Sequence, residues 1–201
     1  MVAFRNIITA ALALATPITA AISAAEVTVN IKVVTQKSMA LQQPAQSISL
    51  VNGPLILIGQ GPFPKLIFGF ADIVTTATAA ISQMQGMPKE PAGPATDAVF
   101  EAFREFVRVH QALLNILIGK AGLFQAVPFI GQPIAAVLRQ IEGVVDTIAF
   151  MLIATFEARA SDFQKEASTL TGTLSLCIAK YDGLSVSRNA NTMSTRRAIA
   201  V

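Results

Sequence analysis

The clearest signal in the chain is a helical repeat of apolar residues in its middle third. They recur every three or four positions, which places their side chains on one face of a helix. The stripe consists of Val99, Phe103, Phe106, His110, Leu113 and Leu117. The pattern predicts an amphipathic helix that begins at Thr96 or Asp97 and ends at Gly119.

The C-terminal third shows the same spacing. One stripe consists of Phe163, Ala167, Leu170, Leu174, Cys177 and Tyr181, and Gly183 is expected to end that helix. A further helix is predicted over 133–158. Between Thr147 and Phe156 this helix is apolar nearly all round. Such a helix is either surrounded by others or in contact with an apolar ligand or surface.

Two more helices are predicted towards the N-terminus. One covers about 64–84 and buries Leu66, Phe70 and Ile73. Residues 27–34 alternate as in a strand, but a helical stripe also runs from Val27 to Ile48. The helix is favoured because no second strand is found to pair with the first. The prediction is an all-α fold, a single-domain bundle of four to five amphipathic helices over residues 26–183.

The first residues have the layout of a secretory signal peptide. A short basic start is followed by an apolar run over 7–15 and then by small residues. We predict a signal peptide over residues 1–21, with cleavage after Ala21 or as late as Ala25. The apolar run is too short to span a membrane, and later uncharged stretches are broken by Pro and Gly. A secreted protein without a transmembrane span is therefore expected.

Charged residues are scarce, and the excess of positive charge lies at the ends of the chain. The sequence is 53% hydrophobic and 13% charged, with a net charge of +3. Without Arg5 and the three arginines of the last eighteen residues, 11 basic and 12 acidic residues remain. Residues 184–201 are predicted to be a flexible tail rich in Ser, Thr and Arg. The near balance of basic and acidic residues and the lack of Trp argue against a nucleic-acid partner.

Residues that could carry catalysis are few. The chain has one histidine, one cysteine and one tyrosine. A single cysteine excludes a disulfide scaffold, and no nucleophile elbow, phosphate loop or metal-ligand spacing occurs. His110 is expected to be a hydrogen-bonded core histidine, and Cys177 a buried thiol. We therefore expect no enzyme, no catalytic residue, no metal and no cofactor.

The shortage of charge favours apolar contact instead. Candidate contacts to an apolar ligand or surface are Phe70, Phe103, Phe106, Phe150, Met151, Ile153 and Phe156. An ordinary bundle core would also account for each of these side chains.

The layout resembles a family of secreted fungal proteins. A signal peptide precedes a helical body without disulfides. In that body a Leu-rich helix ends in the stretch 113–124, and a Pro/Gly turn over 128–133 and two final helices follow. This looks like the hydrophobic surface-binding protein A family, which includes cell-wall galactomannoproteins. The resemblance covers about Val27 to Tyr181. It implies adsorption to hydrophobic surfaces, fatty-acid binding in some relatives, and an extracellular or cell-wall location.

Three functions are compatible with these features. The first is a secreted, non-enzymatic protein that binds hydrophobic surfaces or apolar ligands through its helices. The second is a soluble extracellular carrier of a fatty acid or other lipid in the bundle interior. The third is a membrane-active or host-directed secreted protein. The expected partners are hydrophobic surfaces, lipids or fatty acids, and also the fungal cell wall or a secreted hydrolase.

Overall fold

The computed structural model describes residues 22–49, 51, 55, 59–126 and 131–198. Within them the chain forms five long α-helices and no strand, which confirms the predicted all-α bundle. The helices are α1 (Ala24–Gln46), α3 (Pro62–Met84), α4 (Pro94–Lys120), α5 (Gly131–Thr155) and α6 (Ala160–Ala198), with short 3₁₀ helices η2 (Ala121–Ala126) and η3 (Glu157–Arg159). The signal peptide predicted over residues 1–21 lies outside the described residues.

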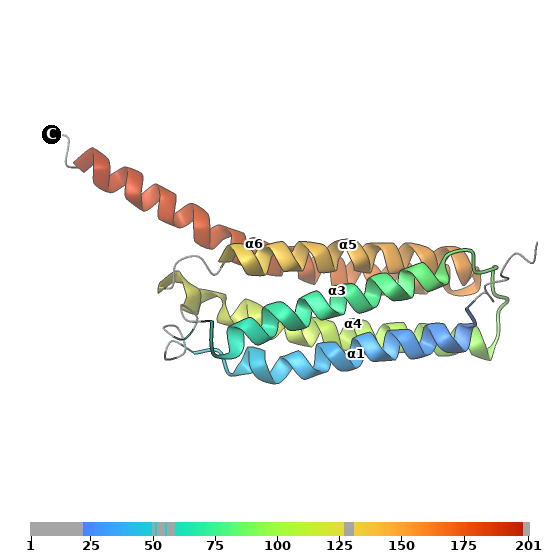
Figure 1. Ribbon diagram of the computed structural model, residues 1–201. Coiled ribbons are helices and arrows are strands. Elements are labelled where there is room, and N and C mark those ends of the chain that lie inside the picture. The colour runs from blue at the N-terminus through green and yellow to red at the C-terminus, as the bar shows by residue number, and fades with distance from the viewer. Residues whose placement is uncertain (1–21, 50, 52–54, 56–58, 127–130, 199–201) are drawn as a thin grey trace, which may run out of the picture.

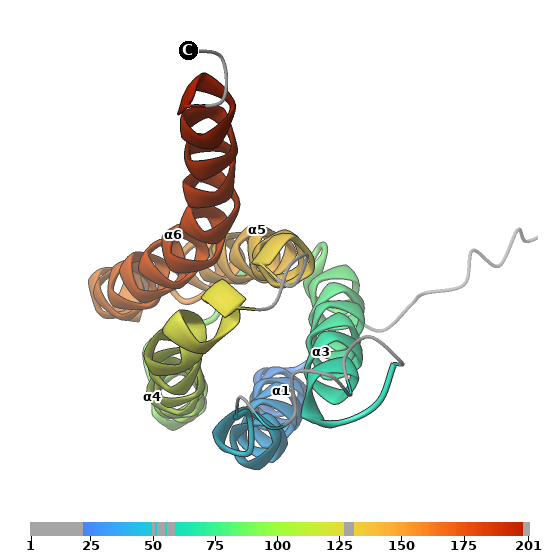
Figure 2. The ribbon, with the colours of Figure 1, turned by 90° about the vertical axis from the view of Figure 1, so that its left-hand side faces the viewer.

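The five helices pack as a ring. Around it, α1 packs on α4, α4 on α6, α6 on α5, α5 on α3, and α3 on α1. Figure 2 shows this ring end-on. Helices α1, α4 and α6 run in one direction, and α3 and α5 in the other (Figure 1). The ring order differs from the chain order, so helices distant in sequence share the interior.

The predicted apolar stripes face that interior. On α1, Val27, Ile31 and Val34 are buried, whereas Val29 and Val33 are exposed. This burial has the period of a helix, so the helical interpretation of residues 27–34 is confirmed. The predicted stripes of α3, α4 and α6 are buried in the same core, apart from the partly exposed Ala167.

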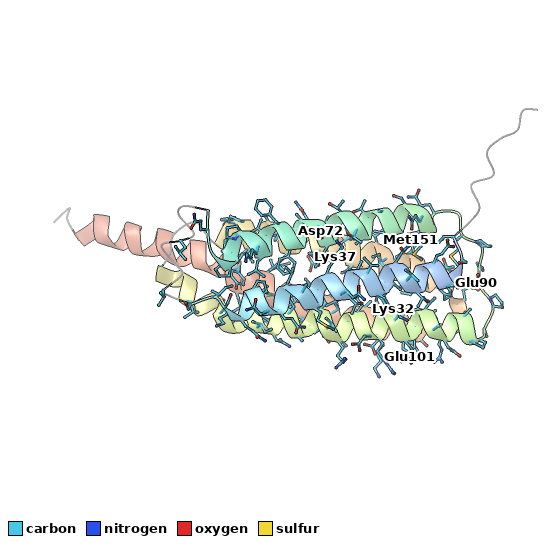
Figure 3. All side chains as sticks on the ribbon, turned by 60° about the horizontal axis from the view of Figure 1, so that its bottom comes forward. Lys32, Lys37, Asp72, Glu90, Glu101 and Met151 are labelled. Carbon is cyan, nitrogen blue, oxygen red and sulfur yellow. The ribbon has the colours of Figure 1, made fainter. Side chains whose placement is uncertain are left out.

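Helices α1 and α3 approach each other closely. A Cβ atom at Gly69 on α3 would lie 2.3 Å from Cδ2 of Leu41 on α1, so only glycine fits there as the side chains stand. The ion pair between Lys37 Nζ and Asp72 Oδ2, 2.5 Å apart, bridges the same two helices (Figure 3).

Two predicted helix boundaries need correction. Helix α4 begins at Pro94 rather than at Thr96 or Asp97, because proline is already suited to the first helical position. Thr96 does not cap the helix; its hydroxyl donates to the Pro91 carbonyl at 2.7 Å. Helix α5 ends at Thr155, before the predicted end at 158, and Phe156 has left helical geometry.

The C-terminal segment also differs from its prediction. Helix α6 passes Gly183, where we expected a stop, and its backbone stays helical to Ala198. Beyond the bundle it projects away from the other helices (Figure 1). Glycine costs a helix only about 1 kcal/mol, and residues 184–198 contain no proline to stop it. The expected helix stop at Gly183 was therefore wrong, whereas the flexibility of residues 184–201 stays a prediction.

Among the described residues one helix, α3, is long and apolar enough to cross a membrane by length and composition alone. The core helix of a soluble protein can meet the same criterion. In this structure α3 takes its place in the ring, with Leu66, Phe70 and Ile73 buried.

Candidate functional site

An apolar groove occupies one end of the ring interior. It is lined by α1, α3, α4 and α5, and Asn30 is its only polar lining residue among those described. On α1 the lining runs from Val27 to Val34, and on α3 from Ile73 to Met84. Eleven residue steps of α-helix span about 16 Å. The groove is therefore long and narrow, a shape suited to a hydrocarbon chain.

The groove is tightly packed. The space between its atoms amounts to about 500 Å³, counting the part open to solvent. Yet only about 20 Å³ is wide enough for the centre of a water molecule. Side chains must separate before a lipid can enter.

Small and flexible side chains give the lining some freedom to move. Ala77 and Ala80 contribute little bulk on α3, and the unbranched side chain of Met84 adapts its shape readily. Beside the groove, Asn30 Nδ2 donates to Gln83 Oε1 at 2.8 Å and so ties α1 to α3.

Two of the predicted contact residues lie on this groove. Phe103 and Phe106 line it from α4, and both are buried. Phe70 and Phe156 are buried but do not line it. The ring of Phe156 instead lies 6.1 Å from that of Phe163, in the aromatic core between α4 and α6.

The other three predicted contacts lie away from the groove on α5. Phe150 is 73% exposed, and Met151 and Ile153 are half-buried. The helix that is apolar nearly all round therefore has one enclosed face and one solvent face. From this segment only Ile148 lines the groove, together with Ile141, Val144 and Val145 earlier in α5.

Next to the groove lies a buried polar pair. Nδ1 of His110 on α4 is 2.9 Å from Oγ of Ser38 on α1, and the Ser38 hydroxyl donates to the Val34 carbonyl at 3.0 Å. A hydroxyl has one proton, so both contacts hold together only if Nδ1 carries the imidazole proton. Nε2 then has a free lone pair.

Nε2 of His110 finds no partner. Among the described residues it is the only buried side-chain nitrogen or oxygen without a hydrogen bond. Burial lowers the pKa of His110 from 6.5 to about 4, so the ring is neutral at physiological pH. The sequence predicted a hydrogen-bonded core histidine, and the structure satisfies only one of its two nitrogens.

Helical register places this pair one turn beyond the groove. Ser38 follows the lining residue Val34 by four positions, and His110 follows Phe106 by four. The rings of Phe106 and His110 are 5.3 Å apart, and Phe70 meets the His110 ring edge-on at 6.3 Å. The side chain of Phe106 thus both lines the groove and neighbours the His110 ring.

The remaining reactive side chains have structural surroundings. Cys177 is a buried free thiol, as predicted, with Sγ 3.9 Å from the Leu114 carbonyl. The Tyr181 hydroxyl donates to the Leu117 carbonyl at 2.8 Å. Across the described ranges, no three His, Cys, Asp or Glu side chains gather to hold a metal ion.

Sequence reasoning missed most of the groove lining on α1, α3 and α5. These positions lie on the predicted apolar stripes, but a stripe does not distinguish groove from filled core. A usable signal was present for the polar pair. Ser38 and His110 each interrupt an otherwise apolar stripe, and a buried polar side chain needs a partner.

The chain was compared with known proteins and structures. No family model and no curated protein matches it. A solved structure is similar: the crystal structure of AFMP4P in complex with palmitic acid, with a TM-score of 0.60 and 15% sequence identity. The match covers 79% of this chain and 99% of AFMP4P. At this identity the likeness shows a shared helical fold.

Proposed function

We propose that this protein is a secreted, non-enzymatic carrier that encloses a long-chain lipid between its helices. The observation that carries the proposal is the long apolar groove between α1, α3, α4 and α5. Of the functions considered from the sequence, the lipid carrier fits this groove best. The secretion signal and the resemblance to the hydrophobic surface-binding protein A family remain part of the proposal.

The size of the hydrophobic effect supports this function. Each methylene group moved from water into an apolar site contributes about 0.8 kcal/mol. A long acyl chain therefore gains enough to offset the separation of side chains that the narrow groove requires. The fold shared with AFMP4P, whose crystal structure contains palmitic acid, also supports a fatty acid as the ligand class.

A variant that fills the groove tests the proposal. Ala80 lines the groove on α3, whereas its neighbour Ala79 is exposed. Ala80→Phe should greatly weaken palmitic acid binding in calorimetric titration of the delipidated protein. Ala79→Phe, the matched control, should bind like the parent chain.

Native mass spectrometry supplies the stoichiometry. A carrier should hold one or two lipid molecules per chain, and the Ala80→Phe variant fewer. If the folded parent protein takes up no fatty acid, or both variants bind it equally well, the interior is not the site.

A second candidate is adsorption to hydrophobic surfaces. Phe68 on α3 and Phe150 on α5 are each 73% exposed, which is unusual for so large an apolar side chain. Depletion onto hydrophobic beads should then fall in a Phe68→Ser, Phe150→Ser double variant and stay unchanged in Ala80→Phe. The reverse pattern, or no depletion beyond that of an ordinary globular protein, would remove this candidate.

A further inference from the structure

Within the polar pair one helical turn from the groove, Nε2 of His110 has no structural explanation among the described residues. A buried acceptor without a hydrogen bond destabilises a folded protein, because the group loses the hydrogen bonds that water would give it. Phe70 and Phe106, which flank the His110 ring, show that an aromatic hydrocarbon is accommodated in these surroundings. A phenylalanine at position 110 would avoid the cost. The unpartnered nitrogen of the imidazole points to a partner that the described residues do not supply.

We propose that Nε2 of His110 accepts a hydrogen bond from the polar end of the bound lipid. This inference rests on the proposed function and specifies its ligand class: a long-chain lipid whose head carries an O–H donor. A fatty alcohol and a protonated fatty acid share this chemistry. An alkyl ester or a plain hydrocarbon lacks it.

The contact between His110 and Ser38 makes Nε2 of His110 a hydrogen-bond acceptor. Because Ser38 donates to the Val34 carbonyl, it accepts from Nδ1, and the proton stays on that nitrogen. The ring neighbours of His110 are Phe70 and Phe106, neither of which bears a charge. A neutral donor can be bound here without burying a bare carboxylate.

The groove gives the lipid a direction. The hydrocarbon chain would lie along Val27 to Val34 of α1 and along Phe103 and Phe106 of α4. Rotation of the Phe106 ring would connect this space to Nε2 of His110, one helical turn further along α4. The head group would then lie beside His110, and the hydrocarbon end would lie towards Val27.

The single histidine makes the test direct in the wild-type full chain. With ¹⁵N-labelled histidine, nuclear magnetic resonance should show Nε2 unprotonated in the lipid-free protein. Hexadecanol or palmitic acid should shift the Nε2 resonance towards that of a hydrogen-bonded nitrogen. Methyl palmitate and hexadecane should leave it in place even where they bind.

A variant measures the contribution to affinity. His110→Phe keeps the aromatic packing and should bind hexadecanol about tenfold more weakly, while methyl palmitate binds as before. Ser38→Ala removes the acceptor that holds the proton on Nδ1. It should reduce the preference for hexadecanol over methyl palmitate without filling the groove.

The outcomes separate this inference from the proposed function. If all four lipids bind but none moves the Nε2 resonance, the carrier function stands and the role of His110 is overturned. If His110→Phe retains the full preference for hexadecanol, the role is likewise overturned. If no lipid binds the folded protein, both proposals fail.

Discussion

Leu41 on α1 occupies the space that a side chain at position 69 on α3 would need. A Cβ atom there would lie 2.3 Å from Cδ2 and 3.1 Å from Cγ of Leu41. Because Leu41 is itself buried, its side chain has little room to retreat. The glycine therefore sets how closely these two helices pack.

Substitution of this glycine should destabilise the fold. Gly69→Ala gains about 1 kcal/mol of helix propensity but loses roughly 1–3 kcal/mol to overpacking. We expect a net loss of about 1 kcal/mol and a lower midpoint in urea unfolding. Gly143→Ala is the control, since nothing lies within 4 Å of a Cβ on that exposed face of α5. Gly143→Ala should stabilise the protein. If both variants raise the free energy of unfolding, or both lower it, the packing argument is contradicted.

Stability should fall in mild acid because of His110. The folded state keeps the imidazole neutral until its pKa of about 4, whereas the unfolded chain takes up a proton near pH 6.5. The unfolded state therefore binds more protons between these values, so acid favours unfolding. From pH 7 to pH 5 the free energy of unfolding should drop by about 2 kcal/mol.

The matched measurement uses urea unfolding of His110→Phe at the same two pH values. That variant should show a much smaller drop. Working at pH 5 and above avoids the titration of Glu26 and Glu105, whose pKa values are lowered below 4.5 by Ser23 and Arg108 respectively. If the free energy of unfolding falls as much between pH 7 and pH 5 in His110→Phe as in the parent chain, His110 is not the group responsible.

The single tyrosine should resist ionisation at high pH. Burial raises the pKa of Tyr181 well above 10, while the unfolded chain titrates near that value. Its contribution to stability is complete below pH 10 and is lost as the pH rises further. Tyrosinate absorbance should appear only as the protein unfolds. Tyrosinate that forms in protein with native circular dichroism would refute the burial of this hydroxyl.

The same side chain should matter at neutral pH. Tyr181→Phe removes the hydrogen bond from the Tyr181 hydroxyl to the Leu117 carbonyl, which lies in the last turn of α4. We expect a loss of about 1–3 kcal/mol in thermal or urea unfolding.

Cys177 should be inert in the folded protein. Burial raises its thiol pKa to about 12, so almost no thiolate is present at neutral pH. A thiol reagent should label it only in denaturant, at the rate of global unfolding. Rapid labelling under native conditions would show that the α4–α6 contact opens locally.

The fold was largely predictable because the apolar residues of each helix recur with the helical period. Even the ambiguous stretch from Val27 to Val34 was resolved correctly, since a lone strand has no partner. The end of α6 was not predictable from Gly183 alone. Glycine permits a helix stop but does not impose one, and nothing after it enforces a turn.

The site was only partly predictable. Phe103 and Phe106 were named, but Phe70 and Phe156 share the same local pattern and lie elsewhere. Whether an apolar residue lines a groove depends on the gap between helices, which the stripe of one helix does not encode. The contact between Ser38 and His110 spans 72 residues and follows from the pairing of α1 with α4.

The ring order has a consequence for how the protein is assembled. Consecutive helices α4 and α5 make little contact, whereas α1 holds α3 and α4 together, and α5 pairs with α6. The chain therefore consists of an N-terminal three-helix unit and a C-terminal hairpin, joined along two seams, α3 with α5 and α4 with α6. The apolar groove takes α5 from one unit and its other walls from the other, so neither unit alone contains it.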